Sequence, residues 1–81
     1  MSETRVASGI RKLTGLPAET PAVVAKVKLS AAEVSRLEDL GLRLGSTVRV
    51  LEGMPGQSVL LAVGDGRIGV NWGVADKIYV H

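Results

Sequence analysis

The residues of this 81-residue chain that could carry out chemistry are few and widely spaced. His81 is the single histidine and the last residue, a position where chains usually fray. We therefore expect no catalytic Ser–His or Asp–His pair to form around it. The sequence contains no cysteine, which excludes disulfides, thiolate zinc sites, iron–sulfur clusters and cysteine nucleophiles. These observations predict a protein that is not an enzyme.

The acidic residues do not form a metal-binding pattern. Asp39, Glu52, Asp65 and Asp76 lack the i, i+4 spacing or the loop pattern of recognisable metal sites. Gly64-Asp65-Gly66 lacks the Lys-Ser/Thr pair that continues a phosphate-binding loop, so a hairpin turn is the better interpretation. We expect no metal site and no cofactor.

The charge balance does not favour nucleic acid as a partner. Ten basic residues stand against eight acidic ones, so the net charge is only +2 although the isoelectric point is about 9.4. The nearest approach to a basic cluster is Arg5, Arg11 and Lys12, with Lys26 and Lys28 further along. Nearby glutamates dilute it, and a solvated surface is the better interpretation of these charges.

The apolar residues indicate a small β domain with an aliphatic core. Fifteen valines and isoleucines stand against ten leucines, and β-branched side chains fit a pleated sheet. Trp72 and Tyr79 are the only aromatic residues, too few for a base-stacking surface. We expect Trp72 to seal the rim of the core. A chain of this length forms one domain and has little apolar surface beyond its core.

The order of apolar and polar residues predicts one helix and five short strands. Alternation with a period of two predicts the strands at residues 22–29, 47–52, 58–63, 67–71 and 78–80. In the first of them, Val23, Ala25, Val27 and Leu29 form one face. The capping box Ser30-Ala31-Ala32-Glu33 begins a helix over residues 31–40, and Gly41 ends it.

The remaining segments connect these elements. Gly53–Gln57 is expected to form a turn, and residues 73–77 a single helical turn. Five short strands with short connections predict a mainly β fold in which the sheet curls into a small barrel and hides its edges. Residues 1–15 have no clear period, and we expect a loosely attached segment with at most a short helix near Val6–Leu13.

The start of the chain lacks the apolar core of a signal peptide, and no run of about 18 apolar residues occurs in the sequence. We expect no insertion into a membrane and a cytoplasmic location. The leftover apolar residues lie beside the helix end and in the following turn: Leu42, Leu44, Met54 and Pro55. They could form a shallow groove for a partner segment. Core filling explains the two leucines equally well, and turn formation explains Met54-Pro55.

Residues 36–50 resemble the signature of the FeoA family, in which a helix ending in Leu-x-Asp-Leu-Gly-Leu precedes a glycine turn and a strand of alternating valines. Leu37–Leu42 and Gly45–Val50 carry these features here. Met54-Pro55-Gly56, the Gly64–Gly66 hairpin and Arg67–Val70 follow in the family's order. The resemblance spans about residues 13–80. It divides the chain into an N-terminal extension over residues 1–12 and a domain over residues 13–81.

Two positions depart from the family pattern. Leu44 stands where many relatives have proline, and Leu13–Glu19 lacks the last glycine of the usual Leu-x-x-Leu-x-x-Gly opening. The departures concern the N-terminal boundary and the loop at Leu44.

The resemblance implies an SH3-like five-stranded barrel with one short helix inserted after the first strand. It also implies a cytosolic, non-enzymatic accessory of bacterial ferrous iron uptake. Its partner would be FeoB, a membrane transporter with a cytoplasmic GTP-binding domain. Under this hypothesis the partner-binding residues are Leu40, Gly41, Leu42, Leu44, Met54 and Pro55.

The alternative is a stand-alone SH3-like module that acts with a metal-responsive transcription regulator or binds nucleic acid. Relatives of this domain are appended to such regulators, and this chain has no helix-turn-helix of its own. The near-balanced charge and the scarcity of aromatic residues disfavour the nucleic-acid version.

Overall fold

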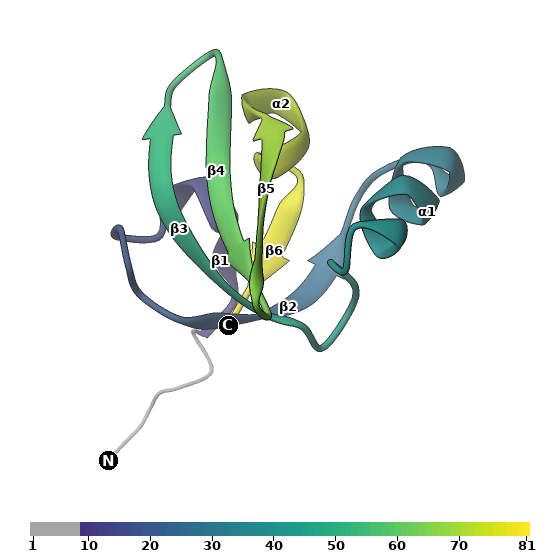
Figure 1. The fold of residues 1–81 in the computed structure, drawn as a ribbon, viewed down its shortest axis with the longest axis horizontal. Helices are drawn as coiled ribbons and strands as arrows, with labels where there is room; N and C mark the ends of the chain where they lie inside the picture. Colours follow the sequence, from purple (N-terminus) through teal and green to yellow (C-terminus); the bar gives the residue numbers. More distant parts are fainter. Residues whose placement is uncertain (1–8) are drawn as a thin grey trace.

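The computed structural model describes residues 9–81, whose strands form one curled antiparallel sheet (Figure 1). The strands are β1 (Arg11–Lys12), β2 (Ala22–Val27), β3 (Thr47–Met54), β4 (Ser58–Val63), β5 (Gly66–Asn71) and β6 (Ile78–Val80). They are hydrogen-bonded in the order β1-β6-β2-β3-β4-β5. The mainly β prediction is confirmed, but the sheet has six strands because β1 pairs with β6.

Three short helical segments accompany the sheet: a 3-10 turn (Leu13–Gly15), helix α1 (Ala31–Asp39) and helix α2 (Trp72–Ala75). Helix α1 follows β2 and stands to one side of the sheet, whereas α2 lies close to β4 and β5 (Figure 1). Both predicted helical segments are present, with ends shifted by one or two residues. None of the helices within residues 9–81 is long and apolar enough to cross a membrane.

Strands β3, β4 and β5 form a meander, and the register between β3 and β4 shifts by one residue at Leu51. Leu61 of β4 lies opposite Val50 of β3 and Ile68 of β5. Met54 is the last residue of β3 and pairs with Ser58, so the turn is shorter than the predicted Gly53–Gln57. The strand continues through Gly53 and Met54 because the backbone pairs with β4 there.

Strand β2 departs from the predicted simple alternation because it contains a bulge at Ala25. Val24 pairs with Val80, but Lys26 pairs with Tyr79, so one extra residue lies on the β2 side. The bulge changes which face the following side chains occupy. Val24 is buried and Lys26 exposed although they are two residues apart. The predicted face is therefore correct for Val27 and Leu29, which pack against the core, and wrong for Val23 and Ala25, which lie before or at the bulge. The strand ends at Val27.

The segment before β2 is attached more firmly than predicted. Arg11 and Lys12 pair with Val80 and Tyr79, and Leu13 is fully buried in the core. The expected helix near Val6–Leu13 is wrong for Arg11 and Lys12, which are extended because they complete the edge of the sheet. Residues 1–8 of the expected extension lie outside the described residues, whereas Arg11 and Lys12 belong to the folded domain.

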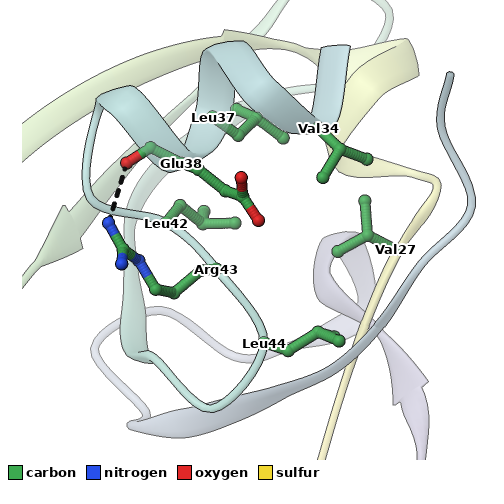
Figure 2. A pocket seen from close by; sticks show the side chains of 7 residues that line it. All are labelled: Val27, Val34, Leu37, Glu38, Leu42, Arg43 and Leu44. Carbon is green, nitrogen blue, oxygen red and sulfur yellow. Dashed lines mark hydrogen bonds between the residues drawn. The ribbon is translucent and has the colours of Figure 1, made fainter. Parts of the chain in front are cut away.

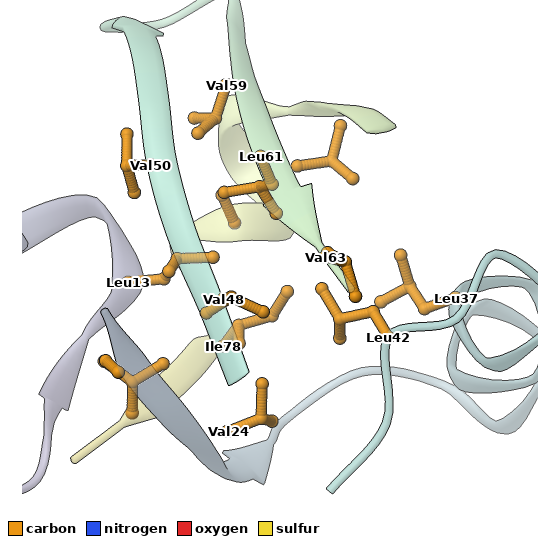
Figure 3. Packing of buried hydrophobic residues seen from close by; sticks show 14 residues of the cluster. Leu13, Val24, Leu37, Leu42, Val48, Val50, Val59, Leu61, Val63 and Ile78 are labelled. Atoms are coloured by element: carbon orange, nitrogen blue, oxygen red, sulfur yellow. The ribbon is translucent and has the colours of Figure 1, made fainter. Parts of the chain in front are cut away.

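The core lies within the curled sheet, with Leu37 of α1 at one edge, and is aliphatic, as predicted (Figure 3). Leu61 lies at its centre and is fully buried, and Leu13 closes one end. Trp72 is partly buried and packs against this cluster, in agreement with a role at the rim of the core. Gly53 lies beside the indole ring: a Cβ atom at position 53 would be 3.5 Å from it, an ordinary contact distance.

Candidate functional site

An apolar pocket of about 120 Å³ lies between β2, α1 and the loop that follows α1 (Figure 2). Leu37 and Val34 project into it from the helix, and Val27 and Leu44 close the opposite side. The complete lining comprises Val27, Val34, Leu37, Glu38, Leu42, Arg43 and Leu44. Five of these seven side chains are aliphatic, so the pocket suits an apolar side chain of a partner.

The start of α1 is fixed by Ser30 as N-cap, which is one half of the predicted capping box. The Ser30 hydroxyl accepts a hydrogen bond of 3.2 Å from the Glu33 N–H. The N-terminus of the helix is therefore held where the chain leaves β2, and this holds Val34 over the pocket.

The end of α1 is a Schellman motif that positions the loop lining the pocket. Gly41 has φ +98°, a conformation that glycine adopts without a Cβ penalty. The Leu42 N–H donates to the Leu37 carbonyl and the Gly41 N–H to the Glu38 carbonyl, both at 2.9 Å. Leu37 and Leu42 make the apolar contact that accompanies this motif (Figure 3).

Polar contacts hold the rest of this loop. The Arg43 guanidinium donates to the Glu38 carbonyl at 3.2 Å (Figure 2). The Ser46 hydroxyl accepts from the Arg43 N–H at 3.0 Å and donates to the Gly41 carbonyl at 3.2 Å. With both ends of the loop bonded, Leu44 is presented at the pocket mouth and remains 65% exposed.

The structure does not bring the six predicted partner-binding residues into one groove. Leu42 is only 1% exposed, so its side chain belongs to the core and is not accessible to a partner. Leu44 lines the pocket described above. Leu40 lines a second pocket, of about 140 Å³, formed by α1, β5 and α2. Leu44 and Leu40 therefore lie on opposite sides of α1, and Gly41 lines neither of these pockets.

Met54 and Pro55 lie away from both pockets, at the turn between β3 and β4. Met54 ends β3 and is 45% exposed, and Pro55 lies in the turn to β4. Neither residue lines the two pockets beside α1. Val27 lines the pocket but is not among the predicted site residues. Its aliphatic side chain and its place just before the helix are signals in the sequence, whereas the bulge in β2 that turns it toward the pocket is not.

His81 and the acidic residues were the other candidates for catalysis or metal binding. His81 is anchored by two backbone hydrogen bonds of 2.9 Å with Val23, so the expectation of a frayed end is wrong for its backbone. The last residue is held because it extends the pairing of β6 with β2. Within residues 9–81, no three histidine, aspartate or glutamate side chains come together in a group that could hold a metal ion.

The curled sheet, the helix inserted after β2 and the apolar pocket beside it define a small SH3-like domain whose accessible cavities suit binding. Comparison with known proteins identifies its family. The family model described as the FeoA domain matches residues 11–81. The chain therefore belongs to the FeoA family.

Two solved FeoA structures show the extent of the similarity. The solution structure of FeoA from Chlorobium tepidum is 32% identical, with a TM-score of 0.81 over 88% of this chain and 69% of that one. FeoA from Stenotrophomonas maltophilia, crystallised with zinc, is also 32% identical, with a TM-score of 0.68 over 85% of this chain and 87% of that one. The latter is described as an SH3 domain protein, in agreement with the predicted fold class.

A manganese-dependent transcriptional repressor shares the fold at 20% identity and a TM-score of 0.75. The match covers 88% of this chain but only 40% of the repressor. A likeness at this identity bears on the fold alone. The comparison with curated protein sequences found no match.

Proposed function

We propose that this protein is a cytoplasmic, non-enzymatic accessory of bacterial ferrous iron uptake. It docks on the cytoplasmic GTP-binding part of a FeoB-type transporter and modulates the assembly or the activity of that transporter. Membership of the FeoA family supports the link to ferrous iron transport. The related S. maltophilia protein is described as a candidate activating factor of bacterial ferrous iron transport.

The observation that carries the docking proposal is the apolar pocket with Leu44 at its mouth. Leu44 is 65% exposed, the largest exposed fraction among the large apolar side chains of residues 9–81. Helix capping and the Arg43 and Ser46 hydrogen bonds hold the surrounding loop in place. A preformed apolar surface loses little conformational entropy on binding and gains from each side chain it removes from water.

The pocket also carries charges that could orient a partner. The Glu38 carboxylate points toward the centre of the pocket, and the Arg43 guanidinium lies at its border (Figure 2). Both side chains are exposed. A partner segment with one apolar anchor flanked by a polar group fits this arrangement, since polar rims give specificity and apolar centres give affinity.

The experiment that tests this function is a calorimetric titration of the cytoplasmic GTP-binding domain of the ferrous transporter from the same organism. We expect the wild type to bind and Leu44→Glu to weaken binding about tenfold or more, because a buried charge replaces an apolar contact. Leu40→Glu is the matched control: it makes the same change at a 48% exposed leucine on the other side of α1.

Circular dichroism first establishes that both variants are folded. Absence of binding by the wild type would overturn the docking function. Equal weakening by Leu40→Glu, or full binding by Leu44→Glu, would show that the pocket between β2 and α1 is not the site of contact.

A further inference from the structure

All four lysines of the chain gather around Tyr79, although they come from three separate parts of the sequence. They are Lys12, Lys26, Lys28 and Lys77. Strand β6 lies between β1 and β2, so Tyr79 has a lysine on each side: Lys12 in β1 and Lys26 in β2 are both its cross-strand partners. Directly opposed residues in an antiparallel sheet point to the same face.

The other two lysines extend this group. The Lys28 ammonium lies 5.1 Å from the centroid of the Tyr79 ring, a cation–π contact. The Lys28 N–H donates to the Lys77 carbonyl at 2.9 Å, which places Lys77 at the same end of β6. All four lysines are exposed. We call this surface the lysine face.

The bulge in β2 is what completes the lysine face. In an unbroken register from the Val24–Val80 pair, Ala25 would lie opposite Tyr79. The extra residue puts Lys26 there instead. A bulge thus places one more positive charge beside the tyrosine.

Little negative charge balances the lysine face. Asp76 lies 3.4 Å from the Lys12 ammonium, and both side chains are about half exposed. No acidic side chain within residues 9–81 forms an ion pair with Lys26, Lys28 or Lys77. Among residues 9–81, the lysine face therefore holds four lysines and one paired aspartate, an excess of three positive charges on one side of the domain.

We propose that the lysine face binds the anionic surface of a lipid bilayer by charge attraction, without insertion. The inference rests on the proposed function, because docking on a ferrous iron transporter would bring the protein close to a membrane. Juxtamembrane lysines each strengthen partition onto an anionic surface about fivefold. Three excess charges therefore give weak binding to the bilayer. Weak binding suits a protein that is also held by its contact with the transporter.

The character of the lysine face favours a bilayer over other anionic partners. Its basic side chains are all lysines, which act as hydrated point charges. It has no arginine that could bind one phosphate through two hydrogen bonds. Protein interfaces are depleted in lysine. Lys28 covers the Tyr79 ring, which is half-buried, so the ring is not free to stack on a base. Neither of the two pockets beside α1 is lined by a lysine.

The geometry is compatible with simultaneous docking on a transporter. Val27 of β2 lines the apolar pocket, whereas its neighbours Lys26 and Lys28 belong to the lysine face. Successive side chains of a strand point to opposite faces. A protein that rests its lysine face on the bilayer therefore keeps the pocket accessible from the other side of β2.

Vesicle sedimentation with the full chain tests the proposal. We expect binding to vesicles with about 30% phosphatidylglycerol, none to pure phosphatidylcholine, and release as NaCl rises from about 50 to about 500 mM. The double variant Lys26→Glu/Lys28→Glu is expected to weaken binding about tenfold or more. Arg36→Glu/Arg67→Glu is the matched control, because it makes the same charge change at two exposed arginines in α1 and β5.

We expect the arginine variant to weaken binding by no more than about threefold, through net charge alone. Absence of wild-type binding to the anionic vesicles, or equal loss in both folded double variants, would overturn the proposal. So would tighter binding to single-stranded RNA than to vesicles at the same salt concentration. The vesicles contain no transporter and the docking titration contains no lipid, so either proposal can fail while the other stands.

Discussion

Strand β2 separates two surfaces of different chemistry. On one side Val27 lines an apolar pocket with α1 and the loop after it, and on the other side Lys26 and Lys28 contribute to the lysine face around Tyr79. The pocket would bind by removing apolar surface from water, which depends little on salt. The lysine face would bind by charge, which salt screens. One six-residue strand thus supports two independent modes of attachment.

The two surfaces also differ in how the sequence assembles them. The pocket is built from residues 27–44, a single continuous stretch. The lysine face joins Lys12 of β1, Lys26 and Lys28 beside β2, and Lys77 before β6, which are brought together only by the pairing of three strands. A local surface can be predicted from neighbouring residues, whereas a surface assembled by strand pairing depends on the register.

The largest expected effect concerns Leu42, which forms the inner wall of the pocket. Leu42→Ala should lower the free energy of unfolding by about 2–5 kcal/mol, because it leaves a cavity where a 1% exposed side chain packs against Leu37. Leu44→Ala, two residues away, should change it by less than about 0.5 kcal/mol, since that side chain is 65% exposed. Urea unfolding followed by circular dichroism measures both values.

This pair of variants divides the apolar surface into a structural and an accessible part. Similar losses of stability in both variants would contradict the division. A stable Leu42→Ala protein would mean that the loop after α1 collapses to fill the cavity, and the pocket could not then be regarded as preformed.

The elements near the pocket were predictable because their signals are local. Ser30 and Glu33 predicted the start of α1, and Gly41 its end, to within one residue. Capping and left-handed glycine are short-range effects, so the sequence contains them in full. The identity of the exposed leucine was not predictable. Leu42 and Leu44 are alike in the sequence, and only the Schellman motif turns the first inward and leaves the second at the surface.

The lysine face was not predictable, because it depends on long-range strand pairing and not on local signals. The bulge at Ala25 reverses the alternation of β2, and β1 has only two residues, too few for any period. Both features are stabilised by pairing with β6, more than 50 residues away in the sequence. The basic residues were interpreted as a solvated surface because glutamates dilute them along the sequence, and the strand pairing brings the lysines together without those glutamates.

A smaller effect is expected at the start of α1, which bears on the pocket and not on the lysine face. Ser30→Ala should reduce the free energy of unfolding by about 1 kcal/mol, because the Glu33 N–H loses its acceptor. Ser35→Ala, the same change at an exposed position within the helix, should leave stability unchanged or raise it by about 0.5 kcal/mol. Urea unfolding distinguishes the two.

The same pair of variants tests the independence of the two surfaces. Vesicle binding by Ser30→Ala should equal that of the wild type, because the lysine face is held by β1, β6 and β2. A parallel loss of stability and vesicle binding would mean that α1 and the lysine face are coupled, which would contradict the separation by β2.

The smallest expected effect is tighter vesicle binding by the variant Asp76→Asn. Within residues 9–81, Asp76 is the acidic side chain that pairs with the lysine face: it lies 3.4 Å from the Lys12 ammonium and accepts a 3.0 Å hydrogen bond from the Thr14 hydroxyl. Asp76→Asn removes its charge but keeps an oxygen for Thr14, so stability should change by less than about 0.5 kcal/mol. Vesicle binding should tighten two- to fivefold, about the contribution of one charge near an anionic surface.

Asp39→Asn is the control for this gain, because it makes the same charge change at the end of α1, away from Tyr79. It should alter vesicle binding less than Asp76→Asn does, since screening limits a charge's effect to about one Debye length, about 10 Å at moderate salt. Equal tightening by the two variants would mean that net charge, and not the arrangement around Tyr79, governs attraction to the bilayer. A gain confined to Asp76→Asn would show that the surface assembled by β1, β6 and β2 acts as a unit.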